Sequence, residues 1–422
     1  MKIIAIILFI AMYAVMIIKS DWRVYAALTV AAIFILLGIQ PISGVPGAID
    51  WNVLMMICGT MIVVDYFIDS KMPNLIADFL LDKSKNVMMV TILMSLFAGV
   101  ISAFIDNVAT VLMVAPVGLA VCKKLKINPV PMILSIAVSS NLQGAATLVG
   151  DTTSIMLGAY AKMDFLSFFW MRGKPGMFWA VELGAAATIP IMMILFRKDT
   201  VPVSAAEFTK VKDKMPSVML IGVVCTLIAA SFIKNKPDVT NGVICMCYAL
   251  LTIVLDYLRT RRTDNAVRAL KGLDFKTLGL LAGLFIVISG LTNIGVIDDL
   301  AGIIMGLGKD NIFILYTVIV WGSVLISAFV DNIPYVATML PVLRGVTTMM
   351  GVEPYLLYFG LLCGATLGGN LTPVGASANI AATGILVKEG HSVSMKDFMR
   401  IGVPFTLTAV MTGYLFIWFV WR

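Results

Sequence analysis

The sequence carries little charge for its length. Asp, Glu, Lys and Arg make up 13% of its 422 residues, whereas about 25% is usual in soluble proteins. Hydrophobic residues make up 60% of the chain and form runs long enough to cross a bilayer, which takes roughly 20 residues per helix. The longest polar stretches, 197–216 and 259–276, have the size of connectors. The composition therefore excludes a soluble catalytic domain and predicts an all-α integral membrane protein.

Several functional motifs are also missing. The six cysteines form no Cys-x-x-Cys pair and are interpreted as packing residues. The strings Gly-x-Ser-x-Gly, His-Glu-x-x-His and the Walker A loop do not occur. The net charge of +7 is explained by basic cytoplasmic loops rather than by nucleic acid. We therefore expect no enzyme, no cofactor and no nucleic-acid partner, and transport driven by an ion gradient or by an external ATPase subunit.

The apolar runs predict ten spans and two stretches that turn back inside the membrane. Those two stretches, 87–121 and 312–350, are each split near the middle by an Asp-Asn pair and are interpreted as re-entrant hairpins. Lys and Arg then gather in the loops placed in the cytoplasm, which puts both termini on the extracytoplasmic side of the inner membrane. The predicted spans are 3–18, 24–40, 51–68, 129–160, 176–196, 216–233, 241–258, 276–296, 354–387 and 401–421.

An internal repeat relates the two halves at an offset of 225 residues. The string around Asp106-Asn107, Ser-Ala-Phe-Ile-Asp-Asn, recurs around Asp331-Asn332 as Ser-Ala-Phe-Val-Asp-Asn. Five spans per half turn the second half upside down, which is the inverted-repeat architecture of many secondary transporters. The predicted units are a first repeat at 1–196, a cytoplasmic linker at 197–215 and a second repeat at 216–422. Within them, the broken helices are 129–160 and 354–387.

The candidate site lies at four breaks, because irregular backbone inside a membrane must be buried in protein or face water. Two breaks are the hairpin tips, and two are Gly-rich interruptions of the broken helices. Their oxygen atoms suit a cation such as Na⁺, and helix N-termini that follow them suit an anion. The candidates for ion or proton coupling are Asp106, Asn107, Thr110, Asp331 and Asn332. The candidates for substrate or ion binding at the broken helices are Asn141, Gln143, Thr147, Gly150, Asp151, Asn370, Thr372, Gly375 and Asn379.

Two interpretations of the hairpin aspartates stay open at this point. An ionised side chain at mid-membrane costs about 2.5–3.5 kcal/mol on insertion scales, which indicates an ion or proton site. Alternatively, Asp106 and Asp331 only cap the helices that follow them. Asp151 has no counterpart, because Ala376 stands at the equivalent position of the second half. That asymmetry favours a specific role for Asp151.

The motifs resemble those of the ion transporter superfamily, within it the ArsB/NhaD-type permeases. The resemblance rests on the run from Ser327 to Pro341 and on the run from Gly369 to Asn379, and it covers about 24–421. It implies a scaffold region, a moving transport region and often a homodimer in the bilayer. This group includes arsenite permeases, Na⁺/H⁺ antiporters and the P protein, and the divalent-anion/Na⁺ symporters are more distant. The first break departs from the group's pattern, since Gln143 replaces a glycine and residues 152–154 lack the usual Pro-Pro-Asn.

Two functions remain open from the sequence. The first is a secondary transporter of a small anion or metalloid oxyanion, coupled to H⁺ or Na⁺ and working by alternating access. The second is a Na⁺/H⁺ antiporter that exchanges cations on Asp106 and Asp331. A membrane-embedded protease or a channel is disfavoured, because the protease motifs are missing and a channel needs no pair of inverted broken-helix sites.

Overall fold

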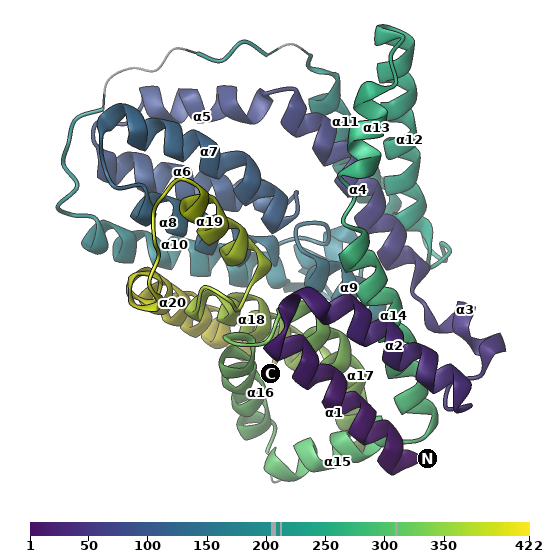
Figure 1. Cartoon of the computed structure of the whole chain (residues 1–422). Coiled ribbons are helices and arrows are strands. Elements are labelled where there is room, and N and C mark those ends of the chain that lie inside the picture. Colours follow the sequence, from purple (N-terminus) through teal and green to yellow (C-terminus); the bar gives the residue numbers. More distant parts are fainter. Residues whose placement is uncertain (204–207, 212, 309–310) are drawn as a thin grey trace.

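The structure is a computed structural model that describes residues 1–203, 208–211, 213–308 and 311–422. The described chain is mostly helical, with one antiparallel pair of two-residue strands, β1 (Trp170–Met171) and β2 (Lys174–Pro175) (Figure 1). The helices up to residue 196 are α1 Lys2–Ile18, α2 Arg23–Leu36, α3 Val45–Ala48, α4 Trp51–Asp69, α5 Met72–Asp82, α6 Val87–Ser102, α7 Asn107–Leu125, α8 Val130–Gly144, α9 Thr152–Tyr160 and α10 Met177–Leu195. Those after residue 196 are α11 Met215–Ala230, α12 Thr240–Thr260, α13 Asp264–Lys271, α14 Phe275–Asn293, α15 Val296–Gly308, α16 Ile312–Ser327, α17 Asn332–Met350, α18 Tyr355–Gly368, α19 Ser377–Lys388 and α20 Met395–Trp421. Short 3₁₀ turns are η1 Ser20–Trp22, η2 Ile42–Gly44, η3 Phe165–Phe168 and η4 Gly369–Leu371.

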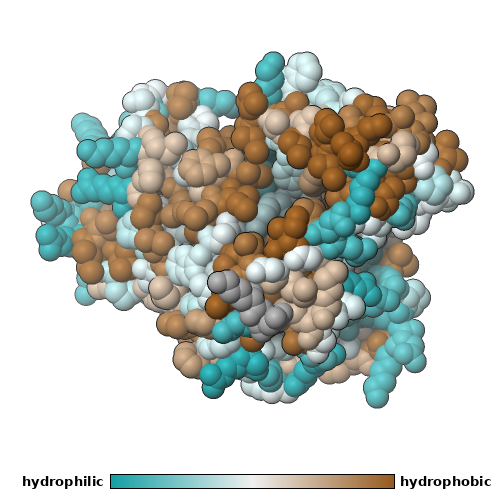
Figure 2. Space-filling model, turned by 90° about the horizontal axis from the view of Figure 1, so that it is seen from below, coloured by the Kyte–Doolittle hydropathy of each residue, from teal (hydrophilic) through white to brown (hydrophobic). Residues whose placement is uncertain are grey.

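Six of the described helices are long and apolar enough to cross a membrane by themselves, namely α4, α7, α10, α12, α14 and α20. The bent pair α15 and α16 would make a seventh. The other predicted spans are shorter apolar helices or pairs of helices on either side of a break. Large apolar side chains are exposed on the outside of the molecule, and hydrophobic colour covers much of the face shown in Figure 2. An apolar exterior of this kind is what a lipid environment requires.

Helix boundaries recur with the spacing of the sequence repeat. The arms α6 and α16 have 16 residues each, and α7 and α17 have 19 residues each. Each pair starts 225 residues apart. The packing partners recur as well, because α6 packs on α8 as α16 packs on α18. In addition, α4 packs on α12 and α2 on α14, so each half contributes a helix to the other.

Three helices lie in segments that the sequence analysis left as connecting loops. These are α5, α13 and α15. In α5, Ala77 and Leu81 are buried on one face while Phe79 is half exposed, which is the pattern of an amphipathic surface helix. Such helices are too short to span a bilayer, so the search for long apolar runs did not find them.

Glycines let the long helices approach each other closely. A Cβ atom added at Gly59 of α4 would lie 2.6 Å from the Cys245 carbonyl oxygen and 2.7 Å from the Met246 nitrogen, both in the backbone of α12. Small residues at such contacts are typical of membrane helix pairs.

We expect Gly59→Ala to lower the melting temperature of the purified protein, because the added methyl group forces α4 away from α12. Overpacking of this kind costs about 1–3 kcal/mol. The matched control is Gly322→Ala in α16, where nothing lies within 4 Å of an added Cβ. Equal melting curves for both variants and wild type would show that the α4–α12 contact is looser than described.

Candidate functional site

The two hairpin aspartates each begin a helix. Asp106 precedes α7 and accepts hydrogen bonds from the backbone N–H groups of Val108 and Ala109, at 3.0 and 3.1 Å. Asp331 precedes α17 and accepts one from the N–H of Ile333 at 3.0 Å. Aspartate is among the preferred residues for this capping position. The capping interpretation therefore holds for both residues, and the question is what else their carboxylates do.

The two Gly-rich breaks are held against the hairpin tips by the same contacts in each half. Helix α8 ends at Gly144 and α9 begins at Thr152, with the break between them. The Thr147 hydroxyl donates a hydrogen bond to the carbonyl of Ala103 at the first tip. The equivalent Thr372 hydroxyl donates to the carbonyl of Ala328 at the second tip. Each break is thereby fixed to the hairpin of its own half.

Gly150 and Gly375 each lie inside a ring of carbonyl oxygens. A Cβ at Gly150 would be 2.5, 2.6 and 2.8 Å from the carbonyl oxygens of Ser102, Gly144 and Ala103. At Gly375 the corresponding distances, to the carbonyl oxygens of Gly369, Ser327 and Ala328, are 2.6, 2.6 and 2.9 Å. Only glycine fits these positions, since any side chain would collide with backbone. The arrangement concentrates partial negative charge at each break.

A buried network of amides joins the two broken helices. The Asn107 side chain donates to the Asn141 side chain at 3.0 Å, and Asn141 donates to Asn370 at 3.1 Å and to the Thr366 carbonyl at 2.8 Å. Asn370 in turn donates to the carbonyl of Val138 at 2.9 Å. These amides are already used within the protein, so their main role is to hold α8 against α18.

The first hairpin tip faces a cavity of about 350 Å³. Five helices turn their N-terminal ends towards it, namely α7, α9, α14, α17 and α19. Three of these ends are capped by an aspartate of the chain: Asp106, Asp274 and Asp331. The ends of α9 and α19 have no side-chain cap, and their first residues, Thr152 and Ser377, line the cavity.

Two carboxylates face this cavity without a basic partner among the described residues. They belong to Asp106 and Asp151, which also share a smaller void of about 10 Å³, roughly the room for one water molecule. The Asp151 side chain is 3% exposed and accepts a hydrogen bond from the Thr153 hydroxyl at 2.6 Å. Asp331 differs, because its carboxylate forms an ion pair with Arg23 at 2.7 Å and accepts a hydrogen bond from Ser377 at 3.1 Å.

The structure separates the predicted site residues into two groups. Those that line the cavity are Asp106, Asn107, Asp151 and Asn332. Those that lie behind it or on its far side are Thr110, Asn141, Gln143, Thr147, Gly150, Asp331, Asn370, Thr372, Gly375 and Asn379. Among these, Gln143 packs against Gly99 of the first hairpin, so it faces away from the cavity. The Asn379 amide donates to the carbonyls of Gly369 and Thr372.

Sequence reasoning missed two residues. Arg23 was counted among the basic residues of the cytoplasmic loops, yet its guanidinium reaches Asp331. Ser102, which is fully buried, has a hydroxyl oxygen with no hydrogen-bond partner, and it lies close to Gly144 beside Asp151. A signal for Arg23 was present, since it stands between two apolar runs that are short for spans. No comparable signal marks Ser102, because its repeat partner Ser327 is bonded to the Ala365 carbonyl.

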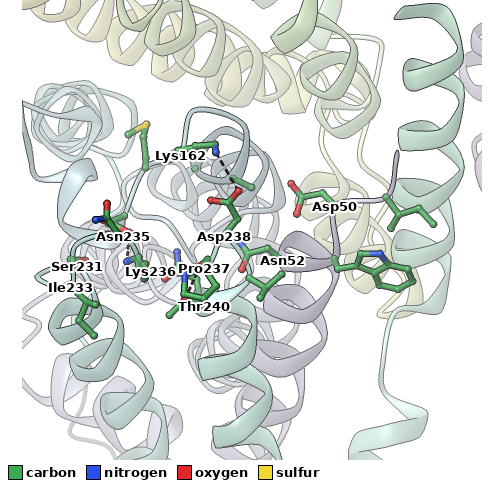
Figure 3. Close-up of a pocket in the computed structure, with 18 of the residues that line it drawn as sticks. Asp50, Asn52, Lys162, Ser231, Ile233, Asn235, Lys236, Pro237, Asp238 and Thr240 are labelled. Carbon is green, nitrogen blue, oxygen red and sulfur yellow. Dashed lines mark hydrogen bonds and ion pairs between the residues drawn. The ribbon is translucent and has the colours of Figure 1, made fainter. Parts of the chain in front are cut away.

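A second, larger pocket of about 840 Å³ lies among the loops 46–52, 158–164 and 231–241 (Figure 3). Its polar walls include the ion pairs Lys162–Asp238, at 3.3 Å, and Lys236–Asp164. Burial raises the pKa of the Asp50 carboxyl at its rim, against the opposing effect of hydrogen bonds from backbone N–H groups. None of the predicted site residues lines this pocket.

The sequence comparisons identify the family. A profile described as citrate transporter, CitMHS, matches residues 6–364. The chain belongs to the CitMHS family. The expected membership of the ion transporter superfamily is thereby confirmed, and so is the expectation of a membrane transporter that is not an enzyme.

Named relatives and solved structures agree with this assignment. An uncharacterized transporter of Mycobacterium tuberculosis is 30% identical over 432 residues, which cover 99% of this chain and 98% of the relative. The human P protein is 24% identical over 96% of this chain and 58% of its own length. The YdaH transporter of Alcanivorax borkumensis has a similar fold, with a TM-score of 0.62 at 12% identity over 95% of this chain and 97% of that one. MtrF of Neisseria gonorrhoeae gives a TM-score of 0.56 at 14% identity over 92% and 84%.

Proposed function

We propose that this membrane protein is a secondary active transporter that moves a small anion together with a cation, Na⁺ or H⁺, by alternating access. The observation that carries the proposal is the cavity into which two uncapped helix N-termini open, beside two unpaired carboxylates. The site thus offers binding groups for both signs of charge. The family's description as citrate transporters supports a carboxylate as the anion.

The anion is expected at the N-termini of α9 and α19. Free N–H groups and the helix dipole favour negative charge there, by about 0.3–1 kcal/mol per helix end. Thr152 and Ser377 add hydroxyl groups at the same ends. A cavity of about 350 Å³ has room for a small polycarboxylate or an oxyanion.

The cation is expected at the first tip, where oxygen atoms gather. The carbonyls around Gly150 and the unpartnered hydroxyl of Ser102 supply neutral oxygens. Asp106 and Asp151 supply negative charge close by. In the described residues, no cluster of three or more His, Cys, Asp or Glu side chains could hold a metal ion, so such a site relies on backbone and hydroxyl oxygens. A cation there offsets the repulsion between the carboxylates and the anion, which couples the two binding events.

We also propose the predicted topology as the frame for transport: two inverted repeats, ten spans, two re-entrant hairpins, extracytoplasmic termini and a homodimer. The recurring helix boundaries support the repeats. Ion pairs join loops that the topology places on the same side, such as Lys123 with Glu389 and Arg172 with Glu353. The lining residues Asp65 and Asp274 lie at helix ends placed near the cytoplasm, so the cavity faces that side in this topology.

The anion site can be tested by the ligand dependence of the melting temperature, since a ligand that binds the folded state raises it by mass action. Citrate, other dicarboxylates, sulfate, phosphate and arsenite are screened at saturating Na⁺ and at several pH values. Ser377→Asp should abolish the shift produced by the anion, because it places a carboxylate at the end of α19, while the shift produced by the cation remains. Ser377→Asn is the neutral control and should keep both shifts. An anion shift that survives Ser377→Asp would place the anion elsewhere.

A Na⁺/H⁺ antiporter is the second candidate, favoured by the two carboxylates that share one small void. An antiporter on these residues moves Na⁺ against H⁺ without any anion. Na⁺-dependent proton movement in vesicles that contain no transportable anion would favour it, and a strict requirement for the anion would exclude it.

A further inference from the structure

The two halves of the cavity region differ in charge although their backbones repeat. Asp331 is paired with the Arg23 guanidinium at 2.7 Å, and the two side chains are 3% and 17% exposed. Asp106, the repeat partner of Asp331, has no basic side chain within ion-pairing distance among the described residues. One hairpin tip therefore carries a built-in positive charge, and the other does not.

The position of Arg23 is fixed by the hairpin formed by α1 and α2. These helices run side by side and meet near the middle of the molecule (Figure 1). The Tyr13 hydroxyl of α1 lies 2.7 Å from the Pro334 carbonyl and 2.7 Å from the Thr338 hydroxyl, both in α17. Because this contact holds the end of α1 on α17, the first residue of α2, Arg23, meets the second hairpin tip.

The remaining polar groups show the same asymmetry. In the first half, the Ser102 hydroxyl lacks a partner and Asp151 adds a carboxylate at the break. In the second half, the equivalent Ser327 hydroxyl donates to the Ala365 carbonyl at 2.5 Å, and Ala376 stands where Asp151 would be. The first half has spare oxygen ligands for a cation, whereas those of the second half are already used.

We propose that Arg23 serves as a resident cation for the second half, so that only the first half binds a transported cation. This inference rests on the proposed coupling of transport to a cation. The guanidinium cannot be deprotonated in a protein, and therefore it holds Asp331 as an ion-paired carboxylate throughout the cycle. A mobile cation can occupy the second tip only if the guanidinium is removed.

The test is a Na⁺ titration of the melting temperature at fixed pH, for wild type, Arg23→Gln, Arg23→Lys and the double variant Arg23→Gln/Asp331→Asn. Wild type should follow a single-site curve. Arg23→Gln should melt lower without Na⁺ and regain stability along a steeper curve with two-site character, because Asp331 has become a cation ligand. Arg23→Lys keeps the charge and should follow the single-site curve. The double variant removes both charges and should also return to it.

The outcomes separate this inference from the proposed function. If wild type and Arg23→Gln both follow single-site curves of equal midpoint, Arg23 does not stand in for a cation, while the coupling proposal survives. If wild type shows no response to Na⁺ at any pH, and none to pH alone, the coupling proposal itself fails. If wild type already follows the two-site curve, both tips bind mobile cations and the role assigned to Arg23 is wrong.

Discussion

Asp106→Asn is expected to remove the cation response of the protein while leaving its fold intact. Asparagine still caps α7, because its side-chain oxygen can accept from the N–H groups of Val108 and Ala109 as aspartate does. What it loses is the negative charge that faces the cavity. Hydrogen bonds and contacts to charged groups contribute about 1.5–3 kcal/mol, so cation affinity should fall ~10-fold to ~100-fold. The measurement is the Na⁺ and pH dependence of the melting temperature.

The control for this prediction is Asp106→Ala, which removes both the charge and the cap. It should lower the melting temperature in the absence of ligand, by the ~1 kcal/mol that a lost cap costs. The pair of variants separates the two interpretations that the sequence left open. If Asp106→Asn responds to cations like wild type and only Asp106→Ala is impaired, Asp106 is a helix cap and takes no part in coupling.

Gly150→Ala is expected to have the second large effect. The added methyl group would lie within 2.8 Å of three carbonyl oxygens, which belong to Ser102, Ala103 and Gly144. All three are backbone atoms, so the hairpin tip and the break must separate to make room. We expect a lower melting temperature and loss of the cation response, since the same carbonyls are the proposed cation ligands.

Two further glycines control for this effect. Gly375→Ala meets an equivalent ring of carbonyls at the second tip, so it should also destabilise the protein. It should nevertheless keep a cation response, because the second tip already holds the Arg23 guanidinium. Gly384→Ala in α19 has nothing within 4 Å and should behave like wild type. A normal cation response in Gly150→Ala would rule out the carbonyl ring as the cation site.

The sequence predicted the fold through features that are local. Apolar runs gave most of the long helices, and Asp-Asn pairs with Gly-rich strings gave the four breaks, whose positions match the ends of α6, α8, α16 and α18. The constant offset of 225 residues predicted that the two halves would share helix boundaries, and they do. The amphipathic helices α5, α13 and α15 were missed because they alternate apolar and polar residues.

The site was predicted less completely, because side-chain direction and long-range contacts do not show in a local pattern. Gln143 is in the predicted break but packs on Gly99, 44 residues earlier in the chain, and so turns away from the cavity. The Arg23–Asp331 pair joins residues 308 positions apart. Nothing near either residue in the sequence indicates their contact, which depends on how the hairpin of α1 and α2 docks on α17.

The central claim, that an anion and a cation move together through the cavity beside Asp151, is tested most directly in proteoliposomes. Uptake of a labelled anion, citrate first among the anions that raise the melting temperature, is measured with and without an inward Na⁺ or H⁺ gradient. Wild type should concentrate the anion only when the gradient is present, and Asp151→Asn should lose that dependence although the protein remains folded. Equal uptake by wild type and Asp151→Asn, unaffected by either gradient, would contradict the account.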